Sequence, residues 1–219
     1  MHGVAYLQEQ IAQKVENLYA VSADVNSEIT ITSGATEALF VAIHPLVGNG
    51  DEIIVFDPAF DSYDPAIKLA GGRAIHNPLS SSSFSIDWER VSEAITPRTR
   101  AIIINSPHNP TGSVISSTDL DELAKLACAK DIAVISDEVY EHMVFDGQQH
   151  HTIASHPGLR DRSFVISSFG KTYHAPGWKV GYCIAAPALT VEFRKVHQFV
   201  TFTTLTNPVG DCRLHGSPP

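Results

Sequence analysis

The chain has 219 residues, of which 43% are hydrophobic and 18% are charged, and this balance is typical of a globular protein with a sizeable core. Its 15 lysines and arginines against 24 aspartates and glutamates give a formal net charge of −9, which argues against nucleic acid or an anionic membrane surface as a partner. The apolar runs are too short to cross a bilayer and no secretory signal pattern is visible, so we expect a cytoplasmic protein.

The first predicted element is an amphipathic helix over roughly residues 4–19. Its apolar residues recur at intervals of three and four, which places them on one helical face: Leu7, Ile11, Val15 and Leu18. We expect this face to pack against the core, with residues 1–23 forming an N-terminal segment ahead of the main domain.

After this helix, short β-branched runs alternate with helical segments. The runs predict strands at residues 29–32, 52–56, 73–76, 101–105, 132–136, 164–168 and 180–184. The other segments predict helices at residues 36–46, 62–69, 87–95, 117–130 and 191–199. Nearly continuous apolar strands among amphipathic helices indicate an α/β fold, with a mostly parallel sheet and helices on both faces. Such a sheet binds ligands at the carboxyl ends of its strands, so the residues after each strand are the candidates for a site.

Two of these strand ends carry motifs that suit an anion and an aromatic ring. Residues 33–38, Ser-Gly-Ala-Thr-Glu-Ala, join a strand to a helix, where free backbone N–H groups and the positive end of the helix dipole attract an anion. An ordinary helix start capped by Ser33 or Thr36 is the alternative. Phe60, within residues 57–63, could stack on a flat ring or could be a core aromatic.

Two further strands end in a loop and in an acidic turn. Asn109 lies in the loop at residues 105–112, where its amide could donate a hydrogen bond, although such a loop alone would be an ordinary turn. Asp137 emerges at a strand end, where it could pair with a protonated ring nitrogen or could cap a helix beginning near Glu138. Tyr140, over the same helical face, could bond a ligand oxygen or belong to the core.

The segment at residues 167–182 offers a primary amine directly after a buried strand, and we expect a strand, a turn and a strand here. Lys171 could form a Schiff base with an aldehyde ligand if the site desolvates it in part. Ser168 and Lys179 could bind a phosphate beside it. A lysine after a strand is in most cases a surface charge, so this hypothesis depends on the neighbouring motifs.

Five motifs together resemble the class I aminotransferases of fold type I, which use pyridoxal 5'-phosphate (PLP), and are most similar to the methionine and kynurenine-type enzymes. They are Ser-Gly-Ala-Thr-Glu-Ala, Asp-Pro-Ala-Phe-Asp-Ser-Tyr, His-Asn-Pro-Thr-Gly, Ser-Asp-Glu-Val-Tyr, and Ser-Phe-Gly-Lys-Thr-Tyr followed by Gly-Trp-Lys-Val-Gly-Tyr. The resemblance implies that Lys171 is the catalytic residue and carries the cofactor as a Schiff base. It also implies a set of cofactor-binding residues: Gly34, Ala35, Thr36, Ser168 and Lys179 at the phosphate, Phe60 against the ring, Asn109 and Tyr140 at the phenolic oxygen, and Asp137 at the ring nitrogen.

The resemblance further implies a reaction and an assembly. An amino acid of methionine, aromatic or kynurenine-like type would give its amino group to PLP and leave as a 2-oxo acid, and a second 2-oxo acid would reverse the steps. The assembly would be a homodimer. A carbon–sulfur lyase shares the cofactor motifs and remains an alternative, as does a non-catalytic remnant that acts as a binding or dimerisation module.

The chain departs from this family in length. We expect residues 24–205 to form the PLP-binding large domain and residues 206–219 to form an aperiodic, disordered tail, with the small domain largely missing. Neither Arg194 nor Arg213 has the context of the family arginine that binds the substrate carboxylate, and Tyr6 does not match the family's N-terminal tyrosine. We therefore expect a fragment or truncated form of an aminotransferase.

Neither metal nor disulfide chemistry is expected. The 11 histidines, His150-His151 among them, form no ligand pattern such as His-Glu-x-x-His. The three cysteines are far apart in sequence and lack Cys-x-x-Cys spacing, which argues against a zinc site and a disulfide framework.

Overall fold

A seven-stranded sheet forms the centre of the computed structural model, which describes residues 3–202 and 204. The strands are β1 (Ile29–Thr32), β2 (Glu52–Asp57), β3 (Arg73–Pro78), β4 (Thr99–Asn105), β5 (Ala133–Asp137), β6 (Ser163–Ser168) and β7 (Gly181–Ala185). They lie in the order β1-β7-β6-β5-β4-β2-β3. Of these seven strands, β7 alone runs opposite to the other six, so the predicted mostly parallel sheet is confirmed.

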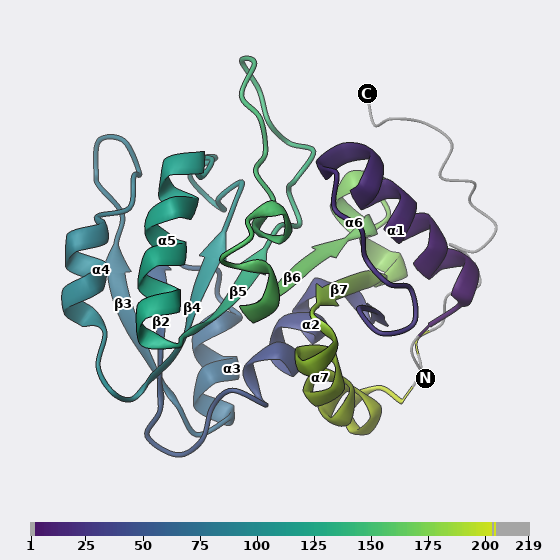
Figure 1. Ribbon diagram of the computed structural model, residues 1–219, viewed down its shortest axis with the longest axis horizontal. Helices are drawn as coiled ribbons and strands as arrows, with labels where there is room; N and C mark the ends of the chain where they lie inside the picture. Colours follow the sequence, from purple (N-terminus) through teal and green to yellow (C-terminus); the bar gives the residue numbers. More distant parts are fainter. Residues whose placement is uncertain (1–2, 203, 205–219) are drawn as a thin grey trace.

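Helices cover both faces of this sheet, as the sequence predicts (Figure 1). One face is covered by α1 (Ala5–Tyr19), α4 (Trp88–Ala94) and α5 (Ser117–Lys130), and the other by α2 (Gly34–Ile43), α3 (Tyr63–Leu69) and α7 (Pro187–Val200). The short helix α6 (Phe169–Thr172) and three 3₁₀ turns (Ile153–Ser155, Arg160–Arg162 and Pro176–Trp178) lie in the connections. Among the described residues, no helix combines the length and the apolarity that a membrane crossing requires.

The two helical layers explain why the strands are apolar on both sides. In β2, Ile54 packs into the core beneath α1, α4 and α5, whereas Ile53 and Val55 pack into the opposite core. All three side chains are fully buried, and burial of each is worth about 1.5–3 kcal/mol relative to exposure. A sheet covered in this way requires the continuous apolar runs from which its strands are predicted.

Helix α1 differs from its prediction at one position. Three residues of the predicted stripe are buried, but Leu18 is 47% exposed, so its predicted place in the core is wrong. The four-residue spacing continues through Tyr19 instead, whose hydroxyl donates a hydrogen bond of 2.6 Å to the Glu141 carboxylate. Ala20 then takes the left-handed conformation (φ 54°), which ends the helix.

The segment after β5 forms turns rather than the helix expected near Glu138. The N–H of Glu138 donates to the carbonyl of Ile166 in β6 at 2.8 Å, and the N–H of Glu141 donates to the carbonyl of Glu138 at 3.0 Å. The bond from Glu138 to Ile166 extends the β5–β6 pairing by one residue beyond the end of β5. The backbone therefore stays extended at Glu138 and does not begin a helix there. The alternative of Asp137 as a helix cap is therefore wrong, and Tyr140 lies on a turn rather than on a helical face.

Other boundaries differ by smaller amounts. Helix α2 begins at Gly34 rather than at residue 36 and ends at Ile43 rather than at residue 46. The turn expected between β6 and β7 contains α6 and a 3₁₀ turn. The predicted tail at residues 206–219 lies outside the described residues, and the division of the chain at residue 23 stays a prediction.

Candidate functional site

A cavity of about 270 Å³ opens at the edge of the sheet where the parallel strands end. All ten residues predicted for the cofactor site line it: Gly34, Ala35, Thr36, Phe60, Asn109, Asp137, Tyr140, Ser168, Lys171 and Lys179. Six further residues complete the lining: Leu39, Asn105, Val139, Gly170, Pro176 and Val180. Parallel strands bring their carboxyl ends to one edge, and residues far apart in sequence meet there for that reason.

The N-terminus of α2 forms the part of the cavity suited to an anion. Ser33 is the N-cap, and its N–H donates to the Glu37 carboxylate at 2.9 Å. The N–H groups of the first helical turn, from Gly34 to Thr36, have no carbonyl partner within the helix. They point outward with the positive end of the helix dipole, which is a favourable position for a phosphate.

Two glycines give this anion-binding end its shape. A Cβ atom on Gly181 would lie 2.6 Å from the carbonyl carbon of Gly34 and 2.8 Å from the nitrogen of Ala35, so only a glycine lets β7 approach α2 this closely. Gly34 itself has φ +78°, a conformation that side chains disfavour. A Cβ atom there would lie 3.7 Å from the amine of Lys179. The anion-binding end, which we call the cradle, is therefore formed by the backbone of Gly34, Ala35, Thr36 and Gly181. The Lys179 amine is the cation beside it.

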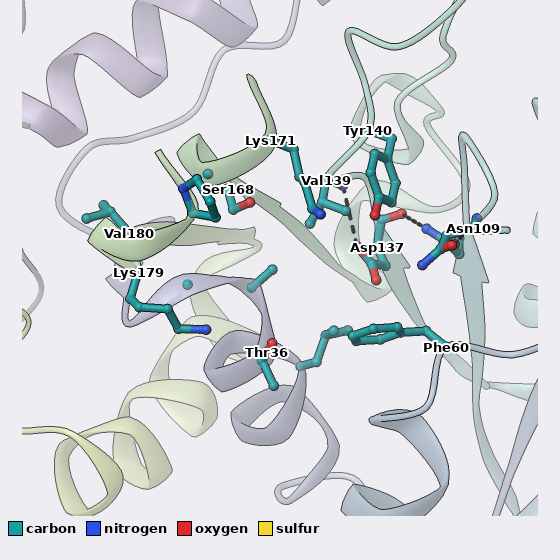
Figure 2. Close-up of a pocket in the computed structure, with 16 residues that line it drawn as sticks. Thr36, Phe60, Asn109, Asp137, Val139, Tyr140, Ser168, Lys171, Lys179 and Val180 are labelled. Atoms are coloured by element: carbon teal, nitrogen blue, oxygen red, sulfur yellow. Dashed lines mark hydrogen bonds between the residues drawn. The ribbon is translucent and has the colours of Figure 1, made fainter. Parts of the chain in front are cut away.

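Lys179 and Ser168 reach the cradle from two neighbouring strands. Ser168 ends β6 and is the N-cap of α6. Lys179 comes two residues before β7, and because β7 runs antiparallel to β6, its beginning lies at the edge where β6 ends. Figure 2 shows the Lys179 side chain extending toward Thr36 across the floor of the cavity. A positive charge at this place adds to the attraction of the helix dipole for an anion.

Lys171 projects from α6 into the opposite part of the cavity. Its amine lies 5.6 Å from the centroid of the Tyr140 ring, and Figure 2 shows both side chains extending into the space above Thr36. The residue as a whole is exposed, so the described residues do not provide the partial desolvation that the sequence analysis expects. A ligand that filled the cavity would supply it.

Asp137 is the buried acid of the site. It is 4% exposed, and its carboxylate accepts a hydrogen bond of 2.7 Å from the hydroxyl of Tyr63 and one of 3.4 Å from the N–H of Val139. Burial raises the pKa of Asp137 to about 6, against the effect of these two donors. A cationic group in the cavity would stabilise the ionised carboxylate and lower this pKa.

Asn109 and Phe60 complete the walls around Asp137. The N–H of Asn109 donates to the side-chain oxygen of Asn105 at 2.7 Å, and the amide of Asn105 donates to the carbonyl of Asp137 at 2.9 Å. These bonds fix the loop after β4 to the end of β5. The Phe60 ring lies below Asp137 in Figure 2 and packs edge-on against Tyr63, 5.6 Å between centroids.

Two residues of the site, Tyr63 and Asn105, are not among those predicted from the sequence. Tyr63 ends one of the quoted motifs and Asn105 begins the loop at residues 105–112, and both donate a hydrogen bond to Asp137. Tyr63 is the first residue of α3 and its N–H donates to the carbonyl of Phe60 at 3.1 Å, a turn contact that no helical or strand period in the sequence predicts.

Arg194 has a structural role away from the cavity. Its guanidinium donates to the carbonyls of Asn26 and Ile29 at 2.6 and 2.8 Å and to the hydroxyl of Thr30 at 3.0 Å, which fastens α7 to β1. Within residues 3–202 and 204, no arginine lines the cavity. Arg213 lies outside this range. In the same part of the chain, no group of three or more His, Cys, Asp or Glu side chains is arranged to hold a metal ion.

Comparison with known proteins identifies the family. The family model described as aminotransferase class I and II matches residues 1–211. The chain belongs to this family. The predicted resemblance is therefore confirmed, and the chain spans about half the length of the curated relatives it matches.

Among these aminotransferases, methionine aminotransferase of Escherichia coli K12 is 50% identical over 206 residues, which cover 94% of this chain and 53% of that protein. Human kynurenine–oxoglutarate transaminase 1 is 40% identical over 185 residues, covering 80% and 44%. A crystal structure of the Escherichia coli protein with methionine aminotransferase function matches with a TM-score of 0.92 at 49% identity, over 95% of this chain and 55% of that one. These likenesses confirm the predicted large-domain architecture of fold type I.

Proposed function

We propose that the cavity binds PLP and that the protein transfers an amino group from an amino acid to a 2-oxo acid. The observation that carries this proposal is the meeting of three chemically different groups in one cavity: the amine of Lys171, the buried carboxylate of Asp137 and the anion cradle at the start of α2. PLP has an aldehyde, a ring nitrogen and a phosphate, and each of these groups has a complementary partner there.

The shape of the cavity supports this fit. Gly181 lets β7 pack directly against the start of α2, where a Cβ atom would lie 2.6 Å from the backbone of Gly34, so the N–H groups of α2 stay free of side chains on this side. Lys179 supplies a cation beside the cradle. At the other end, Asp137 is buried and has a pKa of about 6 without a cationic partner, so a protonated ring nitrogen is the kind of group that would keep it ionised.

Each of the residues predicted for the site has a separate role in this proposal. When bound, PLP supplies an electron sink that makes the α-proton of an amino acid acidic. Lys171 attaches the cofactor through its amine and, once released, can take that proton at Nζ and return it. Tyr140 and Asn109 orient the cofactor oxygen, Phe60 covers one face of the ring, and Ser168 joins Lys179 at the phosphate.

The substrates follow from the relatives rather than from the cavity. Identity to a methionine aminotransferase and to a kynurenine transaminase supports an amino donor of methionine, aromatic or kynurenine-like type, with a 2-oxo acid as acceptor. No arginine for the substrate carboxylate lines the cavity within residues 3–202 and 204. The family resemblance supports a homodimer, and the dispersed cysteines support a reducing compartment such as the cytoplasm.

The test is the visible absorbance of the protein after addition of PLP, compared with Lys171→Ala and with Lys195→Ala as a control. Lys195 lies on α7 in an exposed ion pair with Glu192, remote from the cavity lining. We expect a visible band in the wild type and the control and none in Lys171→Ala. A folded wild-type protein without a band would contradict the proposal.

Turnover separates the reaction classes. With methionine and 2-oxoglutarate, an aminotransferase forms glutamate and needs the acceptor. Release of ammonia and a thiol without any acceptor would indicate a lyase instead. A visible band without formation of glutamate, ammonia or a thiol would identify a protein that binds the cofactor and converts no substrate.

A further inference from the structure

A buried polar cluster lies directly behind the cavity and belongs to the same turn that carries Asp137 and Tyr140. Glu138 and Glu141 in this turn are 2% and 4% exposed. Carboxylates are rarely buried to this degree unless they are paired. Neither lines the proposed cofactor cavity, so the proposed function does not account for either of them.

Glu141 accepts three short hydrogen bonds from two elements, α1 and β6. The donors are the amine of Lys14 in α1, the hydroxyl of Tyr19 at the end of α1 and the hydroxyl of Ser167 in β6, each at 2.6 Å. The hydroxyl of Tyr182 in β7 lies 3.3 Å from the same carboxylate. Burial disfavours the ionised carboxylate, but Lys14 and these donors outweigh it and hold the pKa of Glu141 at about 2.

Lys14 is the cation of the cluster. Its side chain is 14% exposed, and its amine also donates to the Tyr182 hydroxyl at 2.9 Å. Burial disfavours its charge, yet Tyr182 and Glu141 raise its pKa above the usual range, so the pair is ionised at neutral pH. His142, next to Glu141, has its pKa lowered by burial and adds no charge at neutral pH.

Glu138 fixes the other end of the turn. Its carboxylate accepts hydrogen bonds from the Ser136 hydroxyl at 2.7 Å and from the N–H of Ile153 at 3.0 Å. The ring of His150 contacts its second oxygen at 2.9 Å. With both carboxylates held in this way, the backbone from Asp137 to Glu141 is constrained on each side of Tyr140.

The contacts of Glu141 coincide with the segments that carry the proposed cofactor residues. Ser167 directly precedes Ser168, and β6 continues into the helix of Lys171. Tyr182 lies three residues after Lys179. One carboxylate therefore joins the turn of Asp137 and Tyr140 to both lysine-bearing segments, and Lys14 fastens helix α1 to that junction.

We infer that Lys14 and Glu141 are positioning residues that hold the Tyr140 hydroxyl and the Asp137 carboxylate in register with Lys171, so that α1 is a working part of the cofactor site. The inference rests on the proposed function and goes beyond it, because neither residue touches the cavity. Residues that orient the ligands of a metal ion typically change affinity by about 10–100-fold when they are removed, and we take this as the scale for Lys14.

The experiment compares wild type, Lys14→Met, Lys14→Arg and the exposed control Lys195→Met by pH titration of the visible band of bound PLP. A displaced Tyr140 would no longer stabilise the cofactor's phenolic oxygen, which would become more basic. We expect Lys14→Met to raise the apparent pKa of the band by about one unit and to weaken PLP binding about tenfold. In Lys14→Arg, the band pKa and the PLP affinity should both lie close to the wild-type values. Lys195→Met should match the wild type.

A purely structural role for Lys14 would lower the melting temperature without moving the pKa of the band. An unchanged band pKa and PLP affinity in Lys14→Met would overturn the inference and leave the proposed function standing. A wild type that shows no band at all would overturn both.

The variant Tyr19→Phe covers the case in which Lys14→Met does not fold. It removes one hydroxyl donor to Glu141 and keeps the ring, so the core volume is unchanged. We expect a shift of the band pKa in the same direction but smaller. No shift in a folded Tyr19→Phe would then overturn the inference.

Discussion

The two ends of the cavity are built by different means. The anion-binding end is made of backbone: a helix N-terminus, the left-handed Gly34 and the close approach of Gly181, with Lys179 as an exposed cation. At the opposite end, the exposed Lys171 and the buried Asp137 line the cavity with their side chains, and the Lys14–Glu141 pair lies behind them. The first end depends mainly on the shape of the backbone and the second mainly on the charge of side chains. Substitutions at the two ends should therefore have different effects on cofactor binding and turnover.

The largest effect should come from removing the charge of Asp137. Asp137→Asn keeps the size of the side chain and its contact with Tyr63, but it loses the negative charge opposite the cofactor ring. We expect turnover of methionine with 2-oxoglutarate to fall about 10²–10³-fold, while PLP binding changes far less because the anion-binding end is intact. Asp131→Asn, at an exposed helix end where asparagine also tolerates the left-handed conformation, is the matched control. Equal losses in both variants would contradict the assignment.

The anion-binding end should respond to volume instead. In Gly181→Ala the new methyl group would lie 2.6 Å from the backbone of Gly34, and the start of α2 would have to move. Overpacking of this kind costs about 1–3 kcal/mol, and we expect a loss of PLP affinity of about 5–150-fold, measured by titration of the visible band. Gly177→Ala has open space around its Cβ position and should behave like the wild type. Wild-type affinity in Gly181→Ala would show that the cradle does not hold the cofactor.

Removing the cation at the same end should have a smaller effect. Lys179→Met leaves the helix N-terminus in place and takes away one exposed charge. We expect PLP affinity to fall about tenfold and to become less sensitive to salt, because exposed charges are screened. Titrations at low and high ionic strength check both points. An unchanged salt dependence would mean that another group neutralises the phosphate.

The smallest expected effect is on the pH dependence of folding stability. It tests the end of the cavity that contains Asp137 separately from the anion-binding end. The pKa of Asp137 is raised by burial to about 6, compared with about 3.9 in an unfolded chain. The folded state therefore binds this proton more tightly, so its stabilisation is complete below about pH 4 and is lost as the pH rises through 6. The shift of about two units corresponds to at most about 3 kcal/mol.

Thermal unfolding of the PLP-free protein between pH 5 and pH 7.5 checks this sign. We expect the melting temperature to fall with rising pH in the wild type, and the difference between wild type and Asp137→Asn to give the part of that fall that comes from Asp137. Glu141 cannot contribute in this range, since its pKa of about 2 confines its effect to more acidic conditions. If the wild type lost no stability relative to Asp137→Asn as the pH rises, the pKa of Asp137 would not be raised by burial, and the prediction would be wrong.

The sequence was sufficient for the parts of the fold that depend on local pattern. Buried strands between two helical layers are apolar along their whole length, and the candidate residues follow strand ends that parallel pairing brings together. Pairings across long separations leave no such pattern: Lys14 and Glu141 are 127 residues apart, and Tyr63 and Asp137 are 74 apart. The same pairings explain the error at Leu18, because α1 turns Tyr19 toward Glu141.

The single antiparallel strand, β7, has a consequence for how the site can vary. Because β7 returns beside β6, both lysines of the cavity lie on one uninterrupted stretch between Ser163 and Ala185. The spacing between their amines is therefore set by the length of a single connection, at residues 169–180. An insertion or deletion in that connection would change the length of ligand that the two amines can span, while the other five strands kept their register.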